Sequence, residues 1–267
     1  DVNDFYKAVE DADALIVRSD KVTKEVVDAA KKLKIVVRAG AGYDNLDLEA
    51  CTSKNIVAMN TPGQNSNAVA ELAIGMMIYM ARTSFTPATG TELKGKKLGI
   101  HAYGNVGRLV ANIAKGMGME IYAFDPFVKK EQMEKEGVKV CETIEELYST
   151  CNYVSLHIPA TEQTKNSINY ALLSKMPKGG CLINTARKEV IDEADMLKLL
   201  TDREDFKYAT DIAASNQEEL NKFVPRVFAT PKKMGAQTSE ANINAGLAAA
   251  NQIVDFIKNG VTKFKVN

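Results

Sequence analysis

Residues 97–125 read KLGIHAYGNVGRLVANIAKGMGMEIYAFD, and this stretch decides the fold. An apolar run, a glycine turn, an amphipathic segment and a second apolar run follow one another, and Asp125 ends the stretch. In a βαβ unit of this order, backbone amides at the turn and at the helix N-terminus face a pyrophosphate, and an acid after the second strand binds ribose hydroxyls. The stretch predicts a dinucleotide-binding unit; the alternative is a βαβ unit without a nucleotide.

The glycine pattern departs from G-x-G-x-x-G at its first position. Ala102 stands there, whereas Gly104 and Gly107 hold the second and third positions. Ala102 fits this turn if its φ is negative, because a left-handed conformation penalises its Cβ. Since a carboxylate at Asp125 repels a 2′-phosphate, the sequence favours NAD over NADP as the cofactor. The expected cofactor contacts at this end are Tyr103, Gly104, Asn105, Val106 and Asp125.

Short β-branched runs recur between helical stretches along the chain. Nine such runs are ALIVRS, KIVVRAG, NIVAMN, KLGIHAYG, EIYAFD, NYVSLHIP, GCLINTAR, KYATDIA and RVFATP. Apolar strands that alternate with amphipathic helices such as KEVVDAAKKL are typical of parallel sheets covered on both faces. The predicted fold class is α/β.

The chain of 267 residues exceeds the usual size of one core, so we expect two domains. Thr, Gly, Pro and Lys displace the apolar pattern at residues 81–97, the expected hinge. The preceding stretch, residues 66–82, is apolar almost all round, which predicts a helix buried between two layers. Because the chain opens on a helical pattern, we expect the first sheet to lack its initial strand and helix.

Charge and cysteine usage exclude several classes of function. Basic and acidic residues are equal at 34 each, which leaves no global field for a nucleic acid or an anionic membrane surface. No apolar run reaches membrane-spanning length. The four cysteines lie far apart without a CxxC pair, and we interpret them as reduced thiols of a cytoplasmic protein. His101 and His157 are the only histidines and have no partner at ligand spacing, so no metal site is predicted.

Several stretches together resemble the D-isomer-specific 2-hydroxyacid dehydrogenases. They are LIVRSDKVT, VVRAGAGYDNLDLEA, NTPGQNSNAVAEL, SLHIPATEQTK, INTARKEVIDEADM, ATPKKMGAQTSEA and the glycine turn. The resemblance implies a Rossmann-type, doubly wound NAD domain (residues 81–240) inserted into a flavodoxin-like substrate domain (residues 1–80 and 241–267). It also implies a homodimer in which residues 81–93 contact the second subunit.

The same resemblance gives roles to individual residues. Arg187 would bind the carboxylate and carbonyl of a 2-oxo acid, for which a planar guanidinium is suited because it forms a two-point fork; a surface salt bridge is the alternative. Arg38 is a candidate for a substrate phosphate, and Asn65 suits loop capping as well as substrate contact. The implied substrate contacts are Arg38, Ala39, Gly40, Asn65, Arg187 and Lys233. The further implied cofactor contacts are His157, Pro159, Thr164, Thr185, Ala186 and Asp211.

Members of this family carry a histidine after the Thr-Pro turn, paired with a glutamate, and neither stands in its expected place here. Lys233 takes the histidine position when counted back from Gly235, and Lys232 takes it when counted forward from Pro231. We take Lys233 as the catalytic acid and base, because the glycine anchors the following helix. Burial beside Arg187 would lower its pKa by disfavouring the charged form. No residue is assigned to the role of the glutamate.

The resemblance implies NAD-dependent oxidation of D-3-phosphoglycerate to 3-phosphohydroxypyruvate, the first step of serine biosynthesis. The partner would be a small phosphorylated 2-hydroxy acid, whose phosphate needs cations beyond Arg187; Arg38, with Arg18 or a lysine, would supply them. A glyoxylate or hydroxypyruvate reductase stays open. So does a non-catalytic NAD(H)-sensing protein similar to the C-terminal-binding corepressors, although Arg187 would have little use in it.

Overall fold

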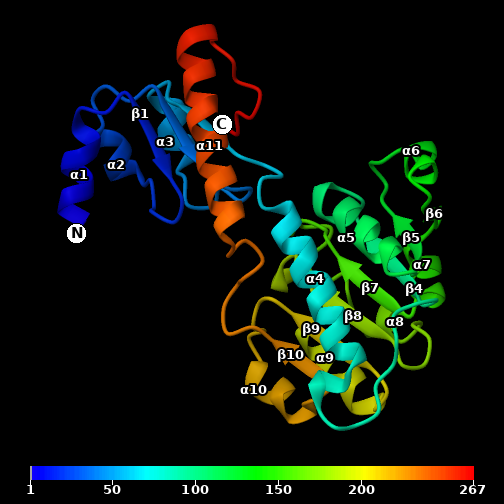
Figure 1. Ribbon diagram of the computed structural model, residues 1–267. Helices are drawn as coiled ribbons and strands as arrows, with labels where there is room; N and C mark the ends of the chain where they lie inside the picture. The colour runs from blue at the N-terminus through cyan, green and yellow to red at the C-terminus, as the bar shows by residue number, and fades with distance from the viewer. Residues whose placement is uncertain (1) are drawn as a thin grey trace. The chain divides into compact units, whose positions relative to one another are not determined.

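The computed structural model describes residues 2–267 and divides them into two compact units (Figure 1). The first unit runs to Asn65 and takes in Ala236–Asn267; the second unit is Ser66–Gly235. These limits differ from the predicted boundaries at residues 80 and 240. The reason is that helix α4 (Ser66–Ala81) packs on the sheet of the second unit.

The first unit is a three-stranded parallel sheet with helices on both faces. Its strands, in sheet order, are β1 (Ala14–Val17), β2 (Ile35–Arg38) and β3 (Val57–Asn60). Its helices are α1 (Val2–Glu10), α2 (Lys24–Ala29), α3 (Leu48–Ser53) and α11 (Ser239–Asn259). Strand alternation assigns Val36 to the core under α2 and α3, and Ile35 and Val37 to the core under α11. The chain opens on a helix, as predicted.

The second unit contains a seven-stranded parallel sheet in the order β10-β9-β8-β7-β4-β5-β6. In chain order the strands are β4 (Lys97–His101), β5 (Glu120–Phe124), β6 (Lys139–Val140), β7 (Tyr153–Leu156), β8 (Cys181–Asn184), β9 (Lys207–Thr210) and β10 (Val227–Ala229). The strand order reverses between β4 and β7. In open α/β sheets, ligands bind outside the carboxyl ends of the strands at such a point.

Two layers of helices cover this sheet. Helices α4 and α5 (Asn105–Gly116) share one core, and α7 (Ile144–Thr150), α8 (Tyr170–Leu173) and α9 (Glu193–Asp202) share the other. Helix α4 buries one side, on which Ala70, Ala73 and Met77 are fully buried, while Asn67 and Glu71 are exposed; burial between two layers stays a prediction. The shorter elements are η1 (Thr83–Phe85), α6 (Lys130–Lys135), η2 (Lys188–Val190), α10 (Gln217–Leu220) and η3 (Asn221–Phe223).

The predicted fold class, α/β, is confirmed. All nine apolar runs form strands, and the two-residue edge strand β6 is the one that the pattern missed. Within the described part of the chain, no helix is both long enough and apolar enough to pass through a bilayer.

The four cysteines are buried and free in the described structure. Burial raises the pKa of the Cys51 and Cys141 thiols to about 11 and that of Cys181 to about 12. It also raises the pKa of Cys151. These thiols are therefore protonated at neutral pH, and Cys51 lies in the first unit while the other three lie in the second.

Candidate functional site

The glycine turn joins β4 to α5 at the carboxyl end of the sheet, beside the reversal of strand order. Ala102 adopts a φ of +79°, so the negative φ predicted for it is wrong. The strand must turn into a helix within a few residues, and this geometry imposes a left-handed residue that costs an alanine about 1 kcal/mol. Gly107 allows the close approach, because a Cβ there would lie 2.3 Å from the Ala102 carbonyl oxygen.

The outer side of the turn is open. Gly104 is the N-cap of α5, and a Cβ on it would meet no atom within 4 Å. The backbone amides of Asn105 and Val106 follow in the first turn of the helix, where helical N–H groups have no intrahelical acceptor and carry partial positive charge. An anion such as a pyrophosphate fits this arrangement.

Asp125 follows β5 and lies against the turn. One carboxylate oxygen, Oδ2, accepts the Tyr103 amide at 2.7 Å, and the other, Oδ1, accepts the Phe127 amide at 2.8 Å. The half-buried carboxylate is thus held in one orientation by two backbone donors. The structure brings together the residues predicted at the adenosine end of a dinucleotide.

A second group of polar side chains lies at or near the carboxyl ends of β7, β8 and β9. Four of its buried side-chain atoms have no hydrogen-bond partner within residues 2–267: Ser155 Oγ, His157 Nε2, Thr185 Oγ1 and Asp211 Oδ1. Buried polar groups are ordinarily paired. Unpaired atoms along three neighbouring strands, next to the open turn, therefore fit a ligand with its own donors and acceptors.

Asp211 is fully buried at the end of β9. Its Oδ2 accepts the Gly235 amide at 3.1 Å, and a Cβ on Gly235 would lie 2.9 Å from that oxygen, which explains the glycine. Burial raises the pKa of Asp211, while the nearby charges of Lys233 and Arg187 oppose the rise. Both cations are therefore close enough to Asp211 to act on it electrostatically.

Arg187 and Lys233 converge on one carbonyl oxygen. Arg187 NH1 donates to the Ala186 oxygen at 3.0 Å, and Lys233 Nζ donates to the same oxygen at 2.9 Å. No hydrogen bond or ion pair of the Lys232 ammonium with a described residue is found; that side chain is exposed. Lys233 is exposed as well, so the burial expected around it is absent, because its loop lies on the surface of the second unit.

The two histidines are structural neighbours. His101, at the end of β4, contacts the Tyr148 hydroxyl through Nδ1 at 3.3 Å, and its carbonyl accepts the His157 amide. Burial lowers the pKa of His101 to about 4, against the opposing charge of Asp125. Burial lowers the pKa of His157 to about 3, and the neighbouring His101 adds to this effect. Both rings are therefore neutral at pH 7, so neither carries the second ring proton that an imidazolium acid would give up.

The remaining predicted cofactor residues of the second unit lie in the loop after β7. Thr164 Oγ1 donates to the Pro159 carbonyl oxygen at 2.6 Å and accepts the Thr161 amide at 2.8 Å. These bonds close an exposed turn of residues 159–164. The loop follows His157 directly at the carboxyl edge of the sheet.

The predicted substrate residues of the first unit gather after β2. Arg38 Nε donates to the Arg18 carbonyl at 3.1 Å, and its guanidinium lies over the loop, since a Cβ on Gly40 would fall 1.6 Å from Arg38 NH1. Gly40 has a φ of +148°, a backbone conformation that residues with a Cβ rarely adopt, which explains the glycine. Ala39 is anchored by its amide, which donates to Val17 at 2.8 Å.

Arg18 and Asn65 differ from expectation. Arg18 donates to the Asn242 side chain and, at 3.4 Å, to the Ala236 carbonyl, so it ties the end of β1 to the segment that enters α11. No side-chain hydrogen bond of Asn65 is found in the described structure, so its side chain caps no loop there.

Sequence reasoning missed Ser155 and the side-chain role of Tyr103. Ser155 could have been found, because it is a serine inside the apolar run NYVSLHIP. The role of the Tyr103 side chain depends on its bond to Glu136, 33 positions away, and no local pattern indicates it. In the described range, no group of three or more His, Cys, Asp or Glu side chains is arranged to hold a metal ion.

Comparison with known proteins identifies the family. Residues 73–232 match the family model described as D-isomer specific 2-hydroxyacid dehydrogenase, NAD binding domain. The D-3-phosphoglycerate dehydrogenase of Methanocaldococcus jannaschii is 35% identical over 281 residues, which cover 99% of this chain and 53% of that protein. The enzyme of the same name from Sus scrofa is 36% identical over 267 residues, which cover 94% of this chain and 50% of that protein. The chain spans about half the length of these curated relatives.

A solved structure gives the same result. The crystal structure of cofactor (NAD+) bound 3-phosphoglycerate dehydrogenase from Entamoeba histolytica superposes with a TM-score of 0.88 at 51% identity, covering 100% of this chain and 86% of that one. The doubly wound second unit and the matched NAD-binding region agree with the resemblance of the sequence motifs. The chain belongs to the D-isomer-specific 2-hydroxyacid dehydrogenase family.

Proposed function

We propose that the protein is an NAD-dependent dehydrogenase that oxidises D-3-phosphoglycerate to 3-phosphohydroxypyruvate in serine biosynthesis. The observation that carries the proposal is the convergence of Arg187 and Lys233 on the Ala186 carbonyl oxygen, beside buried Asp211. Two cations at the carboxyl edge of a dinucleotide-binding sheet suit an anionic 2-hydroxy acid. The relatives described above carry this substrate in their names.

The second unit is the proposed NAD domain. Gly104, Asn105 and Val106 would receive the pyrophosphate, and Asp125 the ribose hydroxyls, with Tyr103 holding that acid. The unpaired atoms of Thr185 and Asp211 would pair with the nicotinamide end, near His157, Pro159, Thr164 and Ala186. When bound, NAD supplies the acceptor for the substrate hydride.

Arg187 and Lys233 would divide the work on the substrate. The guanidinium of Arg187 would hold the carboxylate and the reacting oxygen in a fork, which orients the substrate and stabilises charge on that oxygen. Lys233 would take the hydroxyl proton during oxidation and return it during reduction. A lysine needs no carboxylate to orient it, which is consistent with the absence of the family glutamate.

The first unit is the proposed substrate domain. It supplies Arg38 for the substrate phosphate. The loop of Ala39 and Gly40 would lie against the substrate, but their amides already donate to the Val17 and Arg38 carbonyl oxygens, so they do not hold the carboxylate as expected. Asn65, without a side-chain partner in the described structure, is free to contact substrate. Arg18 is a weaker phosphate ligand than expected, because its guanidinium already bonds Asn242 and Ala236.

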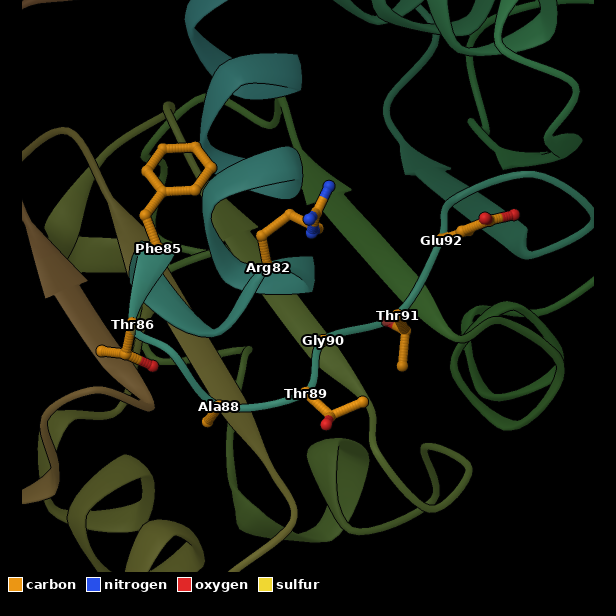
Figure 2. A pocket seen from close by; sticks show the side chains of 8 residues that line it. All are labelled: Arg82, Phe85, Thr86, Ala88, Thr89, Gly90, Thr91 and Glu92. Atoms are coloured by element: carbon orange, nitrogen blue, oxygen red, sulfur yellow. The ribbon is translucent and has the colours of Figure 1, made fainter.

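A homodimer is part of the proposal. The loop that leaves α4 bounds an open hollow of about 540 Å³, shown in Figure 2, and Phe85 on this loop is 68% exposed. An exposed aromatic on residues 81–93 suits contact with a second subunit. Light scattering that reports a monomer at working concentration would contradict this assembly.

We place the protein in the cytoplasm. Its four free, buried cysteines support this compartment, because extracellular proteins more often pair such residues in disulfides. The even balance of charge favours neither a nucleic acid nor a membrane partner.

Steady-state oxidation of NADH with phosphohydroxypyruvate, glyoxylate and hydroxypyruvate as competing substrates tests the proposal. We expect kcat/KM to be highest for phosphohydroxypyruvate and to fall when inorganic phosphate is added. Preference for glyoxylate or hydroxypyruvate would instead assign a reductase of small 2-oxo acids. NADH binding without turnover of any of the three would favour the non-catalytic, NAD(H)-sensing alternative.

A further inference from the structure

A cluster of three side chains, Tyr103, Arg108 and Glu136, lies behind the glycine turn. Tyr103 is only 2% exposed, and its hydroxyl donates to Glu136 Oε2 at 2.8 Å. Arg108, in the first turn of α5, donates to the other oxygen of Glu136. Its guanidinium carbon lies 4.9 Å from the centre of the Tyr103 ring. The cluster ties the turn to the residue that ends α6, Glu136.

The backbone of the same tyrosine serves the cofactor side. Its amide donates to Asp125 at 2.7 Å. A single residue therefore has its ring and hydroxyl fixed by the cluster on one side and its N–H directed at the ribose-binding acid on the other. Any rotation of the peptide between Ala102 and Tyr103 would move this N–H away from the carboxylate.

That peptide is the one under strain. A glycine at position 102 would adopt the observed φ of +79° at no steric cost, whereas alanine favours negative φ. Without a restraint, the turn would relax toward the conformation that alanine prefers. The Ala102 amide bonds the Phe124 carbonyl oxygen at 3.0 Å, and the anchored ring of Tyr103 is the side-chain restraint that follows it.

We propose that Tyr103 is a positioning residue for the dinucleotide. Its hydroxyl bond to Glu136 keeps the turn in the left-handed conformation and thereby keeps Asp125 aimed at the ribose hydroxyls. The inference rests on the proposed NAD-binding function and deepens it. In a turn whose first position is glycine, the backbone adopts the left-handed conformation without help. Here the side chains of Tyr103, Arg108 and Glu136 would hold that conformation instead.

The chain offers a matched control. Tyr170 in α8 donates its hydroxyl to Asp202 at 3.0 Å, and the Lys198 ammonium lies 3.6 Å from its ring centre. This group has the same chemistry as the cluster, a tyrosine between a carboxylate and a cation. It packs between α8 and α9, and neither helix forms the glycine turn.

The test compares Tyr103→Phe with Tyr170→Phe. NADH and NADPH affinities are measured by cofactor fluorescence, which is free of tryptophan background because the chain has no tryptophan. In Tyr103→Phe we expect Kd for NADH to rise about tenfold, the effect of one hydrogen bond to a charged group. Kd for NADPH should stay within about twofold, because Asp125 repels its 2′-phosphate. Tyr170→Phe should leave both values unchanged.

A second background separates positioning from packing. In Ala102→Gly the turn no longer needs the restraint, so the added change Tyr103→Phe should raise Kd for NADH by only about threefold. Hydrogen exchange of the Tyr103 amide without cofactor should quicken in Tyr103→Phe and not in Tyr170→Phe. If Tyr103→Phe does not fold, Glu136→Ala, which removes the acceptor of the hydroxyl, is used, with the same loss of discrimination between NADH and NADPH expected.

Each outcome has a distinct meaning. A wild-type protein that fails to bind NADH would defeat the proposed function itself. Binding that Tyr103→Phe leaves unchanged, or that it weakens equally for NADH and NADPH, would overturn the positioning role alone. So would an equal effect of Tyr103→Phe with and without Ala102→Gly.

Discussion

At the glycine turn both carboxylate oxygens of Asp125 accept backbone amides, whereas at the end of β9 one oxygen of fully buried Asp211 has no partner in the described structure. Thr185, after β8, has an unpaired hydroxyl as well. Two cations, Arg187 and Lys233, share a single carbonyl oxygen there. The acid at the proposed adenosine end is fully paired within the protein, and the polar groups at the proposed reaction end are not.

This difference has an energetic meaning. A buried polar atom without a partner costs roughly 1–3 kcal/mol, which a ligand that pairs it returns as binding free energy. The reaction end is therefore less stable and better suited to discriminate between ligands. The groups at the proposed adenosine end are already oriented, so they would lose little conformational entropy on binding a ligand.

The largest effect is expected from Arg187→Lys, because an ammonium cannot form the two-point fork. We expect kcat/KM for phosphohydroxypyruvate to fall on the order of 10³-fold, as when an oriented donor to a reacting oxygen is removed. The affinity for NADH should change little, since the adenosine end is intact. If kcat/KM fell by less than about threefold, Arg187 would behave like a member of a surface ion pair, and the contrast between the two ends would be lost.

The neighbouring lysines form a matched pair. Lys233→Ala should reduce kcat by about 10²-fold and remove one limb of its pH profile, because a general acid and base is lost. Lys232→Ala, one residue earlier and exposed, should be close to wild type. An undiminished rate in Lys233→Ala would end its assignment as the catalytic residue.

A smaller effect concerns stability in acid. Burial lowers the pKa of His101 from 6.5 to about 4, so the folded state binds this proton more weakly than the unfolded chain. The stability involved is present in full above pH 6.5 and is lost as the pH falls toward 4. Between pH 7 and pH 4, the unfolding free energy of the wild type should therefore fall by about 3 kcal/mol more than that of His101→Gln.

Denaturant unfolding of both proteins at several pH values measures this difference. The charged and titratable groups that face His101 are Asp125, Tyr148 and His157, and they are the same in both proteins. If the unfolding free energies of wild type and His101→Gln changed with pH in parallel, His101 would have the same pKa in the folded and unfolded states.

The smallest effect is expected from Ala102→Gly. Release of the left-handed conformation should raise the unfolding free energy by about 0.5–1 kcal/mol, net of the greater entropy of an unfolded glycine. Ala111→Gly, inside α5, should lower it by about 1 kcal/mol or more. The same sign for both changes, measured by denaturant unfolding, would show that the turn is not strained.

Much of the fold could be predicted because its determinants are local. Apolar runs at strand length gave nine strands, and the order strand, turn, helix, strand, acid gave the dinucleotide unit. Strand β6 was missed because two residues, Lys139 and Val140, form no recognisable run. The φ of Ala102 was mispredicted because the turn, and not the residue type, decides it.

The candidate site was less accessible for a related reason. Residue types and motifs located Asp125, Arg187 and Asp211, which follow strands. Whether an atom such as Ser155 Oγ is paired depends on neighbours from other strands, which no local pattern specifies. Likewise, counting along the loop favoured Lys233 over Lys232 only through its distance from Gly235, whereas the folded chain brings Lys233 to the Ala186 carbonyl oxygen.

The buried thiols give each unit its own reporter of opening. Cys51 in the first unit and Cys181 in the second are protonated and shielded, so an alkylating reagent reaches them only when the surrounding core separates. Mass spectrometry of the labelled peptides would therefore time the breathing of the two units independently, in a single sample and without any added probe.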